Sequence, residues 1–252
     1  MPDLLQSWQQ VVPRFRQAEA IALFLDFDGT LVPLRARPED VWLDAATRRA
    51  LLRLTKCNRV RVWVISGRRL ADVREKIAVA GVHYLGLHGW EGNRNNHRLS
   101  RCTQSYLRQA MWLVARHVNG AAGLRLEDKS AAFALHYRGA PGESVTKARA
   151  AMGRVLDTFT GCFRVIEGDA VLEVLPRELA GKGWYARREW LRLRGAVPIY
   201  LGNDESDESA FVALSGGVTV RVGRRTNSRA RFHLKNPAAV RLFLEKLTAE
   251  VA

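Results

Sequence analysis

Two carboxylates spaced two residues apart, Asp26 and Asp28, directly follow a short apolar run at residues 21–25. Five apolar residues in a row, rich in branched or aromatic side chains, are too few for a buried helix and are typical of a buried parallel strand. Residues i and i+2 of a strand share a face, so both carboxylates could address one reactant, although the chain must begin to turn there. Burying two acids is costly unless a cation or a reaction uses them. The pattern predicts a reactive site; a surface turn rich in Asp and Gly is the alternative.

Polar residues also follow other predicted strands. Ser66 and Gly67 come directly after residues 60–65, an acidic cluster at 203–208 follows residues 197–201, and Lys182 stands where a helix is predicted to begin. In parallel α/β sheets the carboxyl ends of the strands meet at one edge, and ligands bind there. We therefore expect that edge to collect the following side chains: Asp26, Asp28, Ser66, Lys182, Asn203, Asp204 and Asp207.

The chemistry that such a collection predicts is phosphoryl transfer. Clustered carboxylate and carbonyl oxygens suit Mg²⁺, while a hydroxyl, a lysine and free backbone N–H groups at a helix start suit a phosphate. With a metal holding the phosphate oxygens, one carboxylate can attack phosphorus and form an aspartyl-phosphate. A second carboxylate can protonate the leaving oxygen and later deprotonate the attacking water.

The elements that position these residues predict an α/β fold. Strands at residues 21–25, 60–65 and 82–87 each lead into a polar turn and then a helix, which is typical of a doubly wound parallel sheet. Helix start signals stand at Asp44 and at Asn236-Pro237. The pattern changes to helix–strand–strand–helix–strand–strand over residues 93–176, which predicts an inserted α+β cap. The core is then expected to comprise residues 1–92 and 177–252.

Composition excludes several classes of protein. The 252 residues are 47% hydrophobic and 26% charged, ordinary values for a globular chain with a proper core. No stretch has the length of a membrane span and no secretory signal is visible, so we expect no membrane partner. Three widely spaced cysteines in no ligand pattern predict free thiols in a cytoplasmic protein. We also expect the protein to be a monomer. The net charge of +15 is spread along the chain without a basic tail, so no nucleic-acid partner is expected.

Four segments resemble the motifs of the haloacid-dehalogenase-like phosphatases: Asp26-Phe27-Asp28-Gly29-Thr30, Ser66-Gly67-Arg68, Lys182, and Gly202-Asn203-Asp204-Glu205-Ser206-Asp207. Further segments are similar to the trehalose-6-phosphate phosphatases: His88-Gly89-Trp90-Glu91, Glu127-x-Lys129, His136-Tyr137-Arg138, residues 172–176 and residues 204–211. The resemblance covers the chain from about residue 23 to residue 244. It implies Mg²⁺-dependent hydrolysis of trehalose 6-phosphate, a small-molecule substrate, beneath a cap.

The resemblance also implies roles for single residues. Asp26 would be the nucleophile and Asp28 the general acid/base. The phosphoryl group would be held by Thr30, Ser66, Gly67 and Lys182. The sugar would be bound by Arg68, His88, Glu127, Lys129, His136, Arg138 and Glu173. Mg²⁺ would be held by Asp26, the Asp28 backbone carbonyl, Asn203, Asp204 and Asp207.

Some readings stay open. The fourth motif of the family usually begins Gly-Asp-Asp, whereas this chain has Asn203; an amide oxygen can still ligate Mg²⁺, with weaker metal binding expected. Glu127 and Lys129 could instead lie on an ordinary exposed strand face with a cross-strand salt bridge, and His88 and His136 could be structural. Alternative functions are a phosphatase for sucrose phosphate or mannosyl-3-phosphoglycerate, a catalytically silent sugar-phosphate sensor, and a basic nucleic-acid binder.

Overall fold

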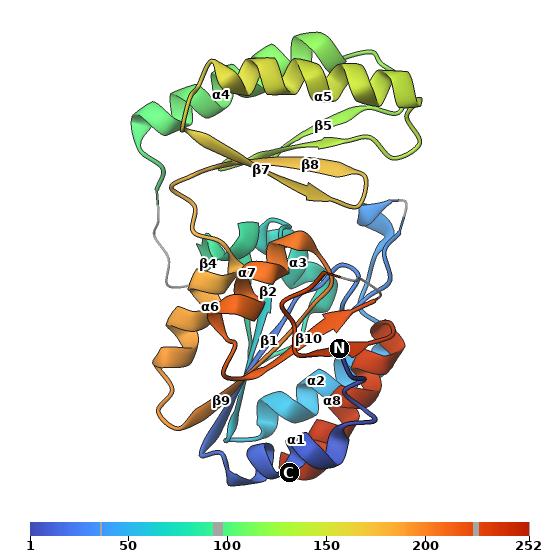
Figure 1. Cartoon of the computed structure of the whole chain (residues 1–252), viewed down its shortest axis with the longest axis vertical. Coiled ribbons are helices and arrows are strands. Elements are labelled where there is room, and N and C mark those ends of the chain that lie inside the picture. The colour runs from blue at the N-terminus through green and yellow to red at the C-terminus, as the bar shows by residue number, and fades with distance from the viewer. Residues whose placement is uncertain (36, 93–97, 224–226, 252) are drawn as a thin grey trace. The chain divides into compact units, whose positions relative to one another are not determined.

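The computed structural model describes the chain except residues 36, 93–97, 224–226 and 252 (Figure 1). The chain divides into two compact units: Met1–Asn95 together with Ala180–Ala252, called the core below, and Asn96–Leu179, called the cap. The first boundary that we predicted, after residue 92, adjoins residues outside the described ones. The boundaries of 1–92, 93–176 and 177–252 therefore stay a proposal.

A seven-stranded sheet runs through the core in the order β11-β10-β9-β1-β2-β3-β4. Every pairing is parallel except that of β3 with β4. This order places β1 at the centre, between β9 and β2, and confirms the predicted α/β class with a mostly parallel sheet. The strands are β1 Ala20–Leu25, β2 Val60–Ile65, β3 Val82–Gly86, β4 Glu91–Gly92, β9 Ala196–Gly202, β10 Val218–Val222 and β11 Phe232–Leu234.

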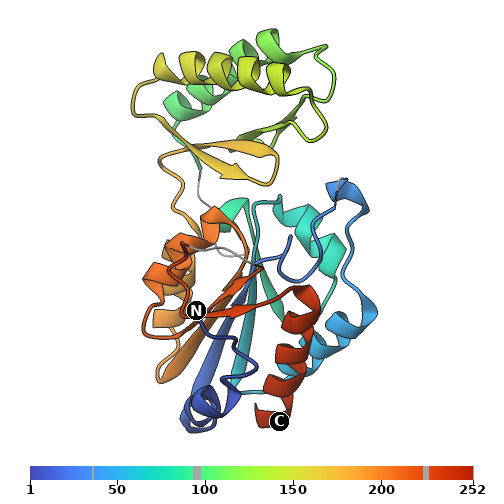
Figure 2. The ribbon, with the colours of Figure 1, turned by 45° about the vertical axis from the view of Figure 1, so that its right-hand side comes forward.

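Helices cover both faces of this sheet, and alternate residues of β1 show the two layers. Leu23 and its i±2 neighbours pack in the apolar cluster that contains α1, α2, α3 and α8. Phe24 packs in a second cluster with α6 and α7. Figure 2 shows the sheet between these two groups of helices. The helices are α1 Trp8–Gln17, α2 Ala45–Lys56, α3 Leu70–Ile77, α6 Lys182–Leu191, α7 Glu205–Ala213 and α8 Pro237–Val251, with 3₁₀ turns η1 Pro38–Asp40 and η2 Leu87–Gly89.

Both helix starts that the sequence signals are confirmed. The Asp44 carboxylate accepts hydrogen bonds from the backbone N–H groups of Ala46 and Thr47, and Asn236 Oδ1 accepts one from Ala239 N. These caps satisfy backbone donors that have no partner inside the helix. Helix α7 and the short strands β4 and β11 were not predicted.

The cap is an antiparallel sheet in the order β5-β6-β8-β7. Its strands are β5 Arg125–Asp128, β6 Phe133–His136, β7 Phe163–Gly168 and β8 Val171–Pro176, and its helices α4 Arg101–Val118 and α5 Gly142–Asp157 lie on one face of the sheet (Figure 1). Glu127, Ala134 and Glu173 are register partners on β5, β6 and β8, so they share a face. None of the described helices is both long and apolar enough to cross a membrane, and all three cysteines are free.

Candidate active site

Asp26 occupies the first position after the central strand. Its backbone N–H donates to Leu201 O at 2.9 Å, which continues the β1–β9 ladder, and the residue is only 4% exposed. Ser66 takes the equivalent place after β2, where its N–H donates to Leu85 O at 2.9 Å. The parallel ladder thus brings both residues to the carboxyl edge of the sheet, as the sequence predicts.

The chain turns sharply after Asp26, and Gly29 allows it to do so. Phe27 O accepts hydrogen bonds from the N–H groups of Thr30, Leu31 and Val32. Gly29 has a φ of +83°, and a Cβ there would lie 2.1 Å from Asn203 Nδ2, so any other residue would clash as well as strain the backbone. The turn holds the segment that carries Asp28 against the Asn203 carboxamide.

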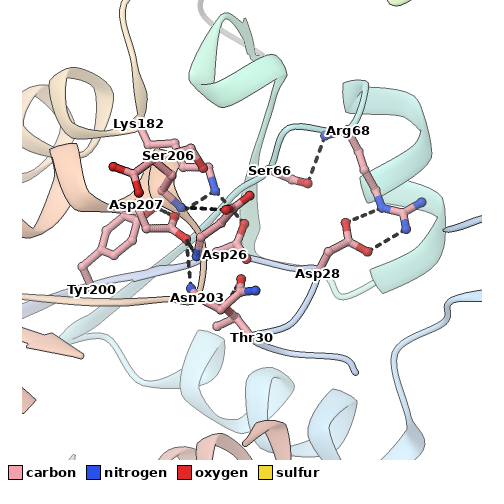
Figure 3. Close-up of polar contacts among 12 residues, drawn as sticks. Asp26, Asp28, Thr30, Ser66, Arg68, Lys182, Tyr200, Asn203, Ser206 and Asp207 are labelled. Atoms are coloured by element: carbon pink, nitrogen blue, oxygen red, sulfur yellow. Dashed lines mark hydrogen bonds and ion pairs between the residues drawn. The ribbon is translucent and has the colours of Figure 1, made fainter. Parts of the chain in front are cut away.

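Lys182 begins α6 and joins two carboxylates (Figure 3). Its Nζ donates to Asp26 Oδ1 at 2.7 Å and to Asp207 Oδ1 at 2.8 Å, and its side chain is 2% exposed. Burial raises the pKa of Asp26 to about 7, against the lowering effect of Lys182. Burial alone would lower the pKa of Lys182, but the charges of Asp207 and Asp26 outweigh it and raise that pKa. One ammonium therefore serves two buried carboxylates.

Asp207 is fully engaged in hydrogen bonds. Oδ1 accepts from Lys182 and from the Tyr200 hydroxyl at 2.8 Å, and Oδ2 accepts from the backbone N–H groups of Asn203 and Asp204 at 2.9 Å each. The residue is completely buried. A carboxylate that accepts four such bonds uses its lone pairs to fix Lys182 and the start of α7. Tyr200 was not predicted as a site residue, and no pattern in the sequence identifies it.

Asp28 points away from Asp26 and toward Arg68 (Figure 3). Arg68 Nε donates to Asp28 Oδ2 at 2.6 Å and Nη2 to Asp28 Oδ1 at 2.7 Å, a bidentate pair. Arg68 Nη1 donates to Asp72 Oδ2 at 2.7 Å. Burial opposes ionisation, yet bonding to Asp28 and Asp72 raises the pKa of Arg68. The two carboxylates of the motif therefore diverge, because the turn after Asp26 ends the i, i+2 alternation.

Asn203 brings one terminal atom of its carboxamide close to three oxygens. That atom lies 2.7 Å from Asp28 O, 3.0 Å from Asp26 Oδ2 and 3.2 Å from Thr30 Oγ1. When the atom is the amide oxygen, it lies in a cluster with the Asp28 and Asp26 oxygens. The negative charges of these three oxygens repel one another unless a cation lies between them. Octahedral Mg²⁺ with bonds of about 2.1 Å places neighbouring oxygens about 3.0 Å apart. The residues present therefore fit a hard cation.

This cluster is not one of acidic side chains alone. Among the described residues, no group of three or more His, Cys, Asp or Glu side chains is placed to hold a metal; the fit depends on a backbone carbonyl and an amide. Asp204 lies at the start of α7, where its Oδ1 accepts from Glu205 N at 2.7 Å. Burial raises the pKa of Asp204.

Two other predicted phosphate ligands lie near this cluster: Thr30, 3.2 Å from Asn203, and Ser66 (Figure 3). Ser66 is 1% exposed and its Oγ accepts from Arg68 N at 3.1 Å across Gly67, while Thr30 is completely buried. His88 lies in η2 with a φ of 57°, and its backbone N–H donates to Ser66 O at 2.8 Å, so it supports the Ser66 turn. Glu91 Oε2 accepts from Leu70 N at 2.6 Å. This bond to the first turn of α3 was not predicted.

Four of the five predicted sugar ligands of the cap are paired with one another. Lys129 Nζ donates to Glu173 Oε1 at 2.7 Å, and His136 Nε2 lies 2.6 Å from Glu127 Oε2. The hydrogen bond with His136 lowers the pKa of Glu127. Arg138 lies apart, where it pairs with Asp169. Side chains therefore pair within the cap, but Lys129 and Glu173 are buried and do not lie on an exposed strand face. Sugar binding by the cap residues stays a prediction.

Comparison with known proteins shows the family to which the sequence belongs. The sequence profile described as trehalose-phosphatase matches residues 24–237. A trehalose-phosphate phosphatase of Mycobacterium tuberculosis is 31% identical over 247 aligned positions, covering 91% of this chain and 62% of that protein. An uncharacterized glycosyl hydrolase of the same species is 34% identical over 269 positions, covering all of this chain but only 20% of that protein. The chain therefore spans less than two thirds of the length of these two relatives.

Among solved structures, the C-terminal domain of trehalose-6-phosphate phosphatase from Candida albicans has a TM-score of 0.85 at 22% identity, and 98% of each chain is covered. At this identity the likeness speaks for the fold. The fold and the matching sequence profile define a member of the haloacid-dehalogenase-like superfamily with a cap. Within that class, the chain belongs to the trehalose-phosphatase family.

Proposed function

We propose that this chain is a Mg²⁺-dependent phosphatase that hydrolyses trehalose 6-phosphate to trehalose and phosphate through an aspartyl-phosphate. The observation that carries the proposal is the buried Asp26 carboxylate at the end of the central strand, 2.7 Å from Lys182 Nζ. A buried carboxylate beside a fixed ammonium and an oxygen cluster suited to a hard cation is what attack on a phosphate dianion needs. Membership of the trehalose-phosphatase family supports the same chemistry.

The residues around Asp26 have separate roles in this proposal. An Asp26 oxygen attacks phosphorus, and the bond from phosphorus to the sugar oxygen breaks. The phosphoryl oxygens gain negative charge during this step. They are held by Lys182, Ser66, Gly67 and Thr30. Asp207 does not contact the substrate; it fixes the Lys182 ammonium through a bond of 2.8 Å.

Asp28 moves the protons. It donates a proton to the departing sugar oxygen in the first half of the reaction. In the second half it takes a proton from the water that attacks the aspartyl-phosphate. Both Asp28 oxygens are bonded to Arg68, so Asp28 must leave that pair in order to act. We assign Arg68 to holding Asp28 rather than to the sugar.

The cation site consists of Asp26, the Asp28 backbone carbonyl and Asn203, with Asp204 beside it. Mg²⁺ bound there would neutralise charge on the phosphoryl group and keep Asp26 ionised. We assign Asp207 to positioning instead, because all four of its bonds go to the protein.

The sugar is assigned to the cap face that carries Glu127, Lys129 and Glu173. Recognition of a disaccharide needs several donors and acceptors, and these side chains supply both. Their present pairing keeps them oriented, and hydroxyl groups can add to such a network. Other sugar phosphates, and binding without turnover, remain the alternatives that the experiment must separate.

The test is phosphate release from a panel of sugar phosphates, with Mg²⁺ and with a chelator. We expect trehalose 6-phosphate to be hydrolysed at least tenfold faster than sucrose phosphate or glucose 6-phosphate, and turnover to stop without Mg²⁺. Asp26→Asn should abolish turnover, while Asp157→Asn, the same change at an exposed position in α5, should keep it. Equal rates across the panel would remove the substrate assignment. Binding of trehalose 6-phosphate with no turnover in the wild-type chain would indicate the silent sensor.

A further inference from the structure

The Asn203 carboxamide has two chemically different ends at one place. A half-turn about its last side-chain bond exchanges oxygen and nitrogen with almost no movement of heavy atoms. The exchange therefore does not disturb Gly29, whose missing Cβ makes room for this side chain. What changes is the group presented to Asp28 O at 2.7 Å and to Asp26 Oδ2 at 3.0 Å.

With nitrogen toward these atoms, both contacts are ordinary hydrogen bonds from an N–H₂ group to acceptors. Thr30 Oγ1, 3.2 Å away, can accept a third. With oxygen toward them, the amide still accepts a hydrogen bond from Thr30 Oγ1 at 3.2 Å, but it faces a carbonyl and a carboxylate that do not donate to it. The first orientation satisfies the site without a cation, and the second is favoured when a cation lies between these oxygens.

We propose that Asn203 is a two-state ligand whose amide turns over when the cation binds. The N–H₂ group occupies the site in the metal-free protein, and the amide oxygen joins the Asp26 and Asp28 oxygens in the loaded one. This inference deepens the proposed function and rests on its cation site. It explains how two buried carboxylates that share the single ammonium of Lys182 persist in a folded chain without a metal.

The device has a cost in affinity. Binding must break the amide's hydrogen bonds before the oxygen can ligate, and a neutral amide attracts a cation less than a carboxylate does. An aspartate at this position would show the reverse balance. It would bind Mg²⁺ more tightly but, when metal-free, would place a third negative charge beside Asp26 and Asp207 with no proton to donate.

The experiment compares wild-type chain, Asn203→Asp and the matched control Asn236→Asp. Asn236 caps α8 through its oxygen, so an aspartate keeps that bond while making the same change in charge. Thermal unfolding is measured with EDTA and with saturating Mg²⁺, and Mg²⁺ affinity by titration calorimetry. For Asn203→Asp we expect a melting temperature several degrees lower in EDTA, full recovery with Mg²⁺, and at least tenfold tighter Mg²⁺ binding. The control should show none of these changes.

A second readout follows the amide itself. In ¹⁵N-labelled protein the Asn203 side-chain N–H₂ signals, assigned by their loss in Asn203→Asp, should move and exchange faster with water as Mg²⁺ is added. Unchanged stability of Asn203→Asp in EDTA overturns the proposal, because Asn203 is then a fixed oxygen ligand. A loss of stability that Mg²⁺ does not restore also overturns it, because the amide is then a structural donor only. None of these measurements uses a sugar phosphate, so failure of the proposed function would leave them interpretable.

Discussion

At the scale of the residue, the burial that suits Asp26 to its proposed role also lowers the stability of the fold when its carboxyl is ionised. Burial raises its pKa to about 7, above the ordinary 3.8 of an aspartate. A carboxyl with a raised folded-state pKa binds its proton more tightly folded than unfolded. Its ionisation therefore lowers the free energy of unfolding as the pH rises from about 4 to about 7, and the loss is complete above 7. In the metal-free protein, ionisation of the proposed nucleophile therefore lowers the stability of the fold.

Asp26→Asn tests this conflict, because the amide imitates the protonated carboxyl. Without Mg²⁺ at pH 8, we expect the variant to be more stable than the wild-type chain by a few kcal/mol, on the order of the pKa shift converted to free energy. At pH 4 the two proteins should unfold at nearly the same denaturant concentration. Urea unfolding followed by tryptophan fluorescence at both pH values measures the difference. A variant that is less stable at pH 8 would show that the ion pair with Lys182 outweighs burial.

A substitution of Arg68 distinguishes a role in sugar binding from a role in positioning Asp28, the proposed general acid. Its guanidinium makes two bonds to Asp28 and one to Asp72. Arg68→Lys keeps the charge but cannot make the bidentate pair. We expect kcat to fall roughly tenfold or more with KM almost unchanged, because the side chain at position 68 no longer holds Asp28 in place. A large rise in KM at constant kcat would instead return Arg68 to the sugar-binding role that the family resemblance implies.

At the scale of the element, the sequence predicts the helices and strands that are marked by a run of apolar residues or by a capping residue. Apolar runs define β1, β2, β3, β9 and β10, and Asp44 and Asn236 mark two helix starts. Helix α7 was not predicted because its opening residues are acidic and were interpreted as metal ligands. The signal that could have indicated the helix is the capping box of Asp204 and Asp207. Strand β11 has three residues, too few to show a period.

The same limit applies to the site. Strand ends predict which side chains gather, since parallel strands end together, but not how they pair. The pairing of Asp28 with Arg68 follows from a turn and a rotamer, which spacing does not encode. The cross-strand contacts of the cap depend on the register of β5, β6 and β8, which no short motif specifies.

The cap sheet is where pairing and function compete, and the Lys129–Glu173 pair tests it. Both side chains are about nine-tenths buried, at 11% and 9% exposed. Removing one partner of this buried pair should cost about 3 kcal/mol, so Lys129→Met should increase local unfolding of the cap. Lys129→Met combined with Glu173→Leu should recover most of that stability.

Hydrogen exchange of peptides from residues 98–179 measures local unfolding within the cap. Lys147→Met is the control, because Lys147 pairs with Glu143 on the exposed side of α5. If these residues bind sugar, the double variant regains protection from exchange but not turnover of trehalose 6-phosphate. If it regains both, the pair is structural only, and the sugar must be recognised elsewhere.

At the scale of the whole molecule, the net charge of +15 should act on encounter with the substrate. A phosphate dianion is attracted to a cationic protein over the Debye length, which is about 30 Å at 0.01 M salt and about 3 Å at 1 M. We expect kcat/KM for trehalose 6-phosphate to fall several-fold as potassium chloride rises across this range, at constant free Mg²⁺. Product inhibition by neutral trehalose serves as the control and should hardly change. A kcat/KM that does not respond to salt would mean that the scattered arginines only solvate the surface and do not steer the substrate.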